Sequence, residues 1–434
     1  MIIHKNRNGC ALHGALKVLD AVDGFVPIVH SSAGCSLQSK LAENLSAANA
    51  GTHFRGALET PDTVVFEKQV IFGGTARLRE QIKNTMKVEK GDLYVVVTGC
   101  APEIVGDDTP AMVKEAQEQG FPVITVSTPG FKGSVYDGYV KTLQHITGYI
   151  VQQKTGHAPD KNRVNILGIV PRQDLRWEGN LHELSHLIAS IGLKSNKLFG
   201  FGENIEAWRS LSNAALNLVV SPWGLPLAQW LEQKYHIPYL DWGYLPVGAG
   251  DTSALLQTLG DFFSTPEDRL KPVIQAGTSY FNYRIRQVAQ SYIRYGFQKN
   301  MAIVGETATV VGVSRFLRDS FGQTISSAII IDNPAEEMRP NILHKLGNEK
   351  TEALFSSDSK EINEKLKGVA PELILGSSLE REAASGLSVP LLEISAPVYD
   401  KLYLQQTYVG YTGAIQLIQD FAEIIIKHDF YKQV

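Results

Sequence analysis

Short runs of β-branched and other apolar residues recur along the chain, each followed by a turn and then an amphipathic segment. Continuous apolar runs are typical of strands buried on both faces of a parallel sheet, and the segments between them have helical periodicity. This alternation predicts an α/β protein with doubly wound, Rossmann-like parallel sheets covered by helices on both faces. The expected strands lie in DLYVVVTGC, FPVITVSTPGF, RVNILGIVP, AALNLVVSPWG, NMAIVGETA, AIIIDNP and ELILGSS.

Two connections interrupt this alternation. Residues 152–163 are polar and contain glycine and proline, and residues 265–300 form a mixed segment rich in tyrosine and arginine. A chain of 434 residues is long enough for more than one domain. We therefore predict three similar α/β domains, at residues 1–155, 160–270 and 295–434.

The composition argues against several partners and compartments. The net charge of −4 provides no basic field for nucleic acid or for an anionic membrane. No apolar run approaches the roughly 20 residues that span a bilayer, and the first residues lack the apolar core of a signal peptide. A disulfide scaffold is also disfavoured, because the chain has only three cysteines and an odd number cannot all pair. We expect a cytoplasmic protein with reduced thiols.

All three cysteines follow a glycine and lie in the first quarter of the chain, at Cys10, Cys35 and Cys100. Cys35 and Cys100 follow expected strands, at the sheet edge where ligands of such folds bind. Thiolates favour iron–sulfur clusters and zinc, and a preceding glycine lets the backbone pass close to a bulky inorganic group. No CxxC is present, which excludes a zinc ribbon or a local ferredoxin-type site. Free cysteines can also be small buried hydrophobes. Three thiolates leave a cluster short of a fourth ligand, which implies a second chain, a non-cysteine ligand or a shared cluster.

The segment HELSH matches the H-E-x-x-H pattern of zinc peptidases, with His182 and His186 on one helix face and Glu183 beside them. It lies within an expected strand–helix unit, where Leu184 and Leu187 belong to an apolar face. A surface helix with two solvent-facing histidines is the favoured interpretation.

Three acidic residues follow Cys100. Glu103, Asp107 and Asp108 are candidate metal ligands or bases, but the two aspartates precede a helix with Pro110 in its first turn. Capping of that helix is therefore favoured for both aspartates. No phosphate-binding loop is present, so nucleotide energy would have to come from another chain.

Five segments, in order along nearly the whole chain, resemble the nitrogenase component 1 superfamily, which includes nitrogenases, their cofactor scaffolds and nitrogenase-like reductases. The segments are VPIVHSSAGC, FEKQVIFGGTARLREQI, TGCAPEIVGDD, STPGFKGS and VPLLEISAPVYDKLYLQQTYVGYTGAIQLI. The resemblance implies that Cys10, Cys35 and Cys100 ligate an iron–sulfur cluster at the interface with a sister α-type subunit. That cluster is an 8Fe–7S P-cluster in true nitrogenases and a 4Fe–4S cluster in simpler relatives.

The resemblance further indicates which kind of chain this is. Cofactor-bearing chains of the family also use one cysteine and one histidine to hold an iron–sulfur cofactor. This chain has no cysteine after Cys100, and the corresponding stretch APVYDKLYLQQTYVGYTG has no histidine. The chain is therefore similar to the β-type, electron-relay subunit of an α2β2 heterotetramer. Two departures, Gly130 in place of a serine and a first ligand already at position 10, favour a divergent reductase or a scaffold over molybdenum nitrogenase.

The leading hypothesis is an oxidoreductase subunit that receives electrons from an ATP-hydrolysing iron protein, seated in part by Phe66 and Phe72. The sister chain would hold the small-molecule substrate, which is dinitrogen, a carbon–sulfur compound or a tetrapyrrole. A scaffold for cofactor assembly is the alternative, and a zinc peptidase using His182, Glu183 and His186 is a third.

Overall fold

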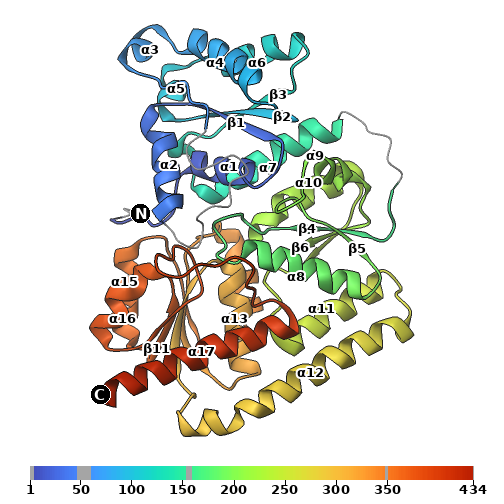
Figure 1. Cartoon of the computed structure of the whole chain (residues 1–434), viewed down its shortest axis with the longest axis vertical. Helices are drawn as coiled ribbons and strands as arrows, with labels where there is room; N and C mark the ends of the chain where they lie inside the picture. The colour runs from blue at the N-terminus through green and yellow to red at the C-terminus, as the bar shows by residue number, and fades with distance from the viewer. Residues whose placement is uncertain (1–3, 46–59, 153–158, 348–349, 434) are drawn as a thin grey trace.

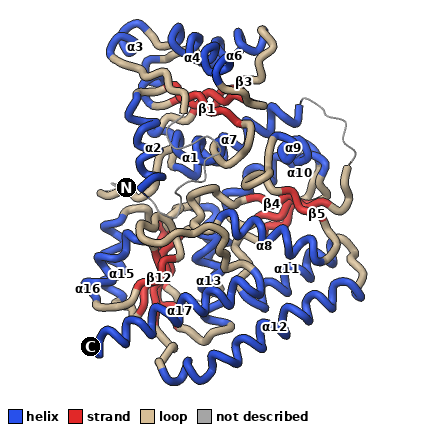
Figure 2. Tube along the Cα trace, viewed as in Figure 1, coloured by secondary structure: helices blue, strands red, loops and turns tan. Residues whose placement is uncertain are grey.

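The computed structural model describes residues 4–45, 60–152, 159–347 and 350–433. The strands of these residues form three separate sheets, each flanked by helices (Figure 1; Figure 2). Every strand pair in the three sheets is parallel. The α/β fold with parallel sheets that the alternation predicts is therefore confirmed.

The first sheet has the strand order β1–β2–β3, and its apolar side chains are buried on both faces. Helices α4 and α6 cover one face, and α1 and α7 cover the other. Its strands are β1 (Phe25–His30), β2 (Leu93–Thr98) and β3 (Val123–Ser127), and its helices are α1 (Ala11–Leu19), α4 (Thr75–Val88), α6 (Thr109–Glu118) and α7 (Val135–Gln152).

The second sheet has the order β5–β4–β6–β7. Buried asparagines cross-link its strands, because the Asn165 amide donates to Asn217 Oδ1 at 2.8 Å and the Asn196 amide donates to Asn165 Oδ1 at 3.0 Å. These bonds satisfy polar groups that would be costly to bury alone. Its elements are β4 (Arg163–Leu167), α8 (Trp177–Ser190), β5 (Lys194–Asn196), α9 (Ile205–Arg209), β6 (Leu216–Val219), α10 (Leu225–Tyr235) and β7 (Tyr239–Asp241).

The third sheet has the order β10–β9–β8–β11–β12, in which the direction of winding reverses between β8 and β11. In a doubly wound sheet, the carboxyl ends at such a reversal form the crevice that binds ligands. Its elements are β8 (Asn300–Gly305), α13 (Thr307–Asp319), β9 (Thr324–Ile330), α14 (Arg339–Leu346), β10 (Glu352–Phe355), α15 (Ser359–Val369), β11 (Leu373–Gly376), α16 (Arg381–Leu387) and β12 (Leu391–Glu393).

Long helices connect the second and third sheets. The tyrosine- and arginine-rich segment expected to be a boundary contains the 28-residue helix α12 (Glu267–Arg294), which packs on α11 (Gly248–Phe262) and α17 (Gly410–Gln433). No helix of the described residues is long and apolar enough to cross a lipid bilayer.

The strands of each sheet lie within one of the ranges 1–155, 160–270 and 295–434. The first boundary falls in residues 153–158, outside the described residues, and the domain limits stay a prediction. Residues 4–9 lie against the third sheet, because Asn6 bridges to Asp358 and Arg7 N–H donates to Ser357 O. The sequence assigned this segment to the first domain, but its residues contact the third.

Candidate metal centre

The structure places the three cysteines at the carboxyl edge of the first sheet. Cys10 is the N-cap of α1, and Cys100 is the first residue of α5 (Cys100–Val105), directly after β2. Cys35 lies in the first turn of α2 (Ala33–Leu45), which follows β1. All three are free and half-buried.

Close contact between α1 and α7 brings Cys10 to this edge. A Cβ added to Gly14 would lie 1.8 Å from Val135 O, and one added to Gly138 would lie 1.9 Å from Ala11 O. Only glycine permits the two helix backbones to approach so closely. The contact sets Cys10 beside Ser134, with which it forms an isolated antiparallel bridge.

Gly130, the first residue of the 3-10 helix η2 (Gly130–Lys132), separates two of the thiols. A Cβ on Gly130 would lie 3.4 Å from the Sγ atoms of both Cys10 and Cys100, and 3.1 Å from the Cβ of Cys10. Both sulfurs therefore border one small space that a side chain here would fill. The Gly130 N–H also donates to Cys100 Sγ at 3.2 Å. Such a bond stabilises negative charge on sulfur.

Cys35 packs at the edge of the same hydrophobic core as Cys10, and its Sγ lies 3.7 Å from Ser32 Oγ. Within the described ranges, no three His, Cys, Asp or Glu side chains converge as ligands of a single metal ion. Three free thiols at one sheet edge, two of them beside Gly130, are donors of the type that holds an iron–sulfur cluster.

The acids after Cys100 have separate roles. Asp108 is the N-cap of α6 and accepts a hydrogen bond from Ala111 N at 3.0 Å, as predicted. Asp107 does not cap the helix, so that part of the prediction is wrong. Its Oδ1 accepts from Gly74 N at 2.7 Å, and its Oδ2 lies 3.0 Å from His30 Nε2. The loop between α5 and α6 turns Asp107 inward, which the local sequence does not reveal.

His30 and Asp107 form a buried pair whose side chains are at most 3% exposed. Burial lowers the pKa of His30, although the Asp107 carboxylate opposes this. The neutral imidazole donates from Nε2 to Asp107 and accepts at Nδ1 from Thr63 Oγ1, 2.9 Å away. The pair ties the end of β1 to the loop that follows α5.

Glu103 is part of a hydrogen-bonded group beside Cys100. Burial raises the pKa of Glu103, but hydrogen bonds from Thr98, Ser127 and Lys132 outweigh burial, and the net shift is downward. Thr98 Oγ1 donates at 2.5 Å and Lys132 Nζ at 3.2 Å. The carboxylate is thus held ionised by donors and is not poised as a base.

Of the two residues expected to seat a partner, Phe72 is the last residue of the short helix α3 (Glu67–Phe72), and Phe66 is its N-cap. Figure 1 places α3 at the top of the molecule, beside α5. Phe66 is 57% exposed and Phe72 80% exposed, and α3 buries none of its residues. These two rings are therefore available to another protein.

The H-E-x-x-H segment lies on α8, as expected, and Leu184 and Leu187 are buried there. His182 and His186 are both exposed, and Glu183 lies 3.9 Å from His186 Nδ1. This arrangement agrees with a surface helix.

Sequence reasoning did not single out His30 or Gly74, and it assigned Asp107 a capping role in place of its contacts with these two residues beside the cysteine site. All three lie in segments that carried the family resemblance, namely VPIVHSSAGC, IFGGTARL and CAPEIVGDD. A polar residue at the end of a buried strand was the available signal for His30. Its partner is 77 positions away, so only the fold could identify Asp107.

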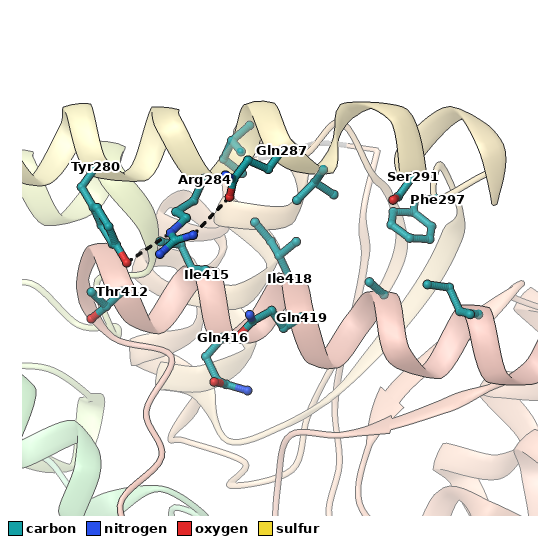
Figure 3. Close-up of a pocket in the computed structure, with 14 residues that line it drawn as sticks. Tyr280, Arg284, Gln287, Ser291, Phe297, Thr412, Ile415, Gln416, Ile418 and Gln419 are labelled. Carbon is teal, nitrogen blue, oxygen red and sulfur yellow. Dashed lines mark hydrogen bonds between the residues drawn. The ribbon is translucent and has the colours of Figure 1, made fainter.

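An apolar groove of about 450 Å³ lies between α12 and α17, at the opposite end of the molecule from α3 (Figure 1). Figure 3 shows Arg284 at its rim, donating to Tyr280 OH and to Gln287 Oε1, each at 3.2 Å. The groove is therefore separate from the cysteine site.

The chain is similar in sequence to proteins of known family. Residues 10–426 match the sequence profile of the family described as "Nitrogenase component 1 type Oxidoreductase". The chain is 25% identical over 455 aligned residues to the nitrogenase molybdenum-iron protein beta chain of Methanococcus maripaludis, covering 96% of this chain and 93% of that protein. It is 24% identical to the nitrogenase vanadium-iron protein beta chain of Trichormus variabilis, covering 97% and 94%.

The solved structure of nitrogenase Cp1 at pH 6.5 superposes with a TM-score of 0.81, at 19% identity and over 98% of this chain and 94% of that chain. This likeness shows a shared fold. The match over residues 10–426 and the beta-chain relatives show that the chain belongs to the nitrogenase component 1 type oxidoreductases, as a beta-type chain.

Proposed function

We propose that this chain is the β-type, non-cofactor-bearing subunit of a nitrogenase-like reductase, and that Cys10, Cys35 and Cys100 ligate an iron–sulfur cluster. The observation that carries the proposal is the space beside Gly130, bordered by the sulfurs of Cys10 and Cys100. When bound, an iron–sulfur cluster takes up and releases single electrons and so links an electron donor to a substrate-reducing site.

The residues around the thiols would hold and tune this group. The Gly130 N–H donates to Cys100 Sγ, which stabilises the thiolate, and the hydrophobic core behind Cys10 and Cys35 keeps water from that side. Three thiolates from one chain do not complete a cluster. A sister α-type subunit would supply the remaining ligands, give an α2β2 assembly and hold the small-molecule substrate.

The electron donor would be a separate ATP-hydrolysing iron protein. This chain contains no phosphate-binding loop, and the exposed rings of Phe66 and Phe72 provide an apolar surface for transient docking. Phe72 lies on α3 and Phe66 is its N-cap, and α3 is close to α5 and hence to Cys100.

The test is anaerobic co-purification with the sister chain, followed by iron and sulfide counts and EPR. About eight irons per αβ interface would indicate a P-cluster, and about four would indicate a 4Fe–4S cluster. We expect Cys100→Ala to lose most of this iron because it removes one thiolate ligand. The double variant His182→Ala/His186→Ala is the control and should keep all of it.

Unchanged iron in Cys100→Ala would overturn the cluster assignment. Zinc in place of iron, lost in the histidine variant, would support a peptidase instead. Transfer of the bound group to a separate apoprotein without turnover would favour the assembly scaffold.

A further inference from the structure

Helix α3 is weakly anchored although it carries the exposed Phe72. None of its residues is buried, and it ends at Gly73, whose φ of +87° requires glycine. The next residue, Gly74, donates its N–H to Asp107 Oδ1 at 2.7 Å. Elements with few buried contacts move at little cost. This hydrogen bond restrains the backbone directly after α3.

Asp107 connects this restraint to the cysteine site. It lies just beyond α5, which begins at Cys100, and its own N–H donates to Pro102 O in that helix at 3.0 Å. Its second carboxylate oxygen contacts His30 Nε2 at 3.0 Å. The His30 carbonyl in turn accepts from Gly99 N, at 2.9 Å, immediately before Cys100. Two routes of hydrogen bonds thus lead from Asp107 to Cys100.

The packing around Gly74 leaves no room for a side chain. A Cβ on Gly74 would lie 2.5 Å from Asp107 Oδ2 and 3.0 Å from His30 Cε1. If Gly74 moved toward His30 and Asp107, these two side chains would have to move as well. Close-packed interiors shift between arrangements and do not deform smoothly.

We propose that Asp107 and His30 are positioning residues that transmit the displacement of α3, when a partner docks at Phe72, to α5 and Cys100. The inference rests on the proposed function, because the docking partner is the iron protein. It adds a route by which docking would alter the surroundings of Cys100 before an electron passes from the iron protein to the cluster.

The experiment compares Asp107→Ala with Asp108→Ala in the complex with the sister chain. Asp108 is the adjacent acid, but it is exposed and caps α6 only. Hydrogen–deuterium exchange would be followed at residues 67–74 and 100–107, with and without the iron protein held by a non-hydrolysable ATP analogue. In the wild type and in Asp108→Ala, we expect docking to change exchange in both segments.

In Asp107→Ala, the change at residues 67–74 should persist and the change at residues 100–107 should disappear. Reduction by the iron protein should slow about tenfold, a typical coupling effect. Reduction by methyl viologen radical, which gives up one electron without docking, should stay within about twofold of the wild type. A role confined to folding would not separate these two electron donors.

Gly74→Ala provides a second variant if Asp107→Ala binds less iron. It keeps both side chains of the pair but displaces them, and we expect the same loss of response at residues 100–107. An unchanged response at residues 100–107 in both variants, in a complex that binds iron and the iron protein, would overturn the coupling alone. A wild-type complex that binds neither would overturn the proposed function as well.

Discussion

Gly130 donates its N–H to Cys100 Sγ, and its missing side chain leaves open the space between Cys100 and Cys10. We expect Gly130→Ala to lower iron and sulfide content and to reduce the free energy of unfolding by about 1–3 kcal/mol, because the new methyl lies 3.1 Å from Cys10 Cβ. Metal counts and urea unfolding of the complex measure both effects. Gly148→Ala in α7 is the control, since a Cβ there meets no atom within 4 Å. Full iron content in Gly130→Ala would contradict the prediction.

We also expect a second single residue, Glu306, to make stability depend on pH. Among the residues that the structure describes, none donates a hydrogen bond to either carboxylate oxygen of the buried Glu306. Burial first, and then the nearby carboxylates of Asp174 and Asp332, raise its pKa well above the ordinary value, although Arg7 opposes this. The folded chain therefore favours the neutral carboxyl group. The resulting stability is fully present below about pH 4.5 and is lost as the pH rises toward the raised pKa.

Glu306→Gln should remove this loss because the amide stays neutral. We expect its free energy of unfolding to exceed that of the wild type at pH 8, and the excess to shrink toward pH 5, at about 1.4 kcal/mol per pH unit across the titration. Urea unfolding at several pH values measures the difference. The same substitution at the exposed Glu336 should leave the pH profile unchanged. An equal gain at pH 5 and pH 8 would disprove the titration of Glu306.

At the scale of single elements, α3 presents its side chains to solvent and not to the core. We expect Phe72→Ala to weaken binding of the iron protein by about 10- to 100-fold, in the range of an interface hot spot, and to leave iron content and stability unchanged. Binding to the complex, measured by titration, checks this. Ile293→Ala is a matched control because Ile293 is 84% exposed and belongs to α12, which lies at the opposite end of the molecule from α3 (Figure 1). Equal affinities of the two variants would remove α3 from the docking surface.

Elements whose residues alternate regularly were predictable from the sequence. The apolar runs are strands, and HELSH lies on an amphipathic helix with Leu184 and Leu187 inside. Asp108 was recognised as a cap because its carboxylate accepts from Ala111 N, only three residues further along the chain. The contacts of Asp107 with Gly74 and His30 were not predicted, since these residues lie 33 and 77 positions away from it. Local patterns therefore predicted local contacts only.

At the scale of the whole molecule, the N-terminal segment joins the third sheet to the cysteine site. Arg7 donates from Nη2 to Glu380 Oε1 at 2.7 Å and to Ser377 Oγ at 3.2 Å, both just beyond β11. The side chain amide of Asn8 donates to Ile331 O, just beyond β9, at 2.7 Å. This segment thus covers the carboxyl edge at which doubly wound sheets bind ligands. Two residues later it reaches Cys10.

Arg7→Ala should loosen this connection. The Arg7–Glu380 pair is at most 2% exposed, and removal of the cation leaves a buried carboxylate, at a cost of about 3–5 kcal/mol. We expect lower stability by urea unfolding and faster hydrogen exchange at residues 4–11, with partial loss of iron. Lys271→Ala breaks the exposed pair with Glu267 and should cost about 0.5 kcal/mol or less. Unchanged exchange at residues 4–11 in Arg7→Ala would exclude this anchoring role.

The sequence by itself determined the α/β class, the parallel strands, the helix start at Asp108 and the positions of Cys35 and Cys100 after strands of the first sheet. Each depends on periodicity or on neighbours within a few positions, where backbone geometry is set by local chemistry. Only the tertiary structure decided that Gly130 borders the sulfurs of both Cys10 and Cys100, that Asp107 turns inward to His30, and that Arg7 is bound beyond β11. These contacts join residues from about 30 to more than 300 positions apart. Such residues meet only when helices and strands from distant parts of the chain pack together, and no local pattern specifies those contacts.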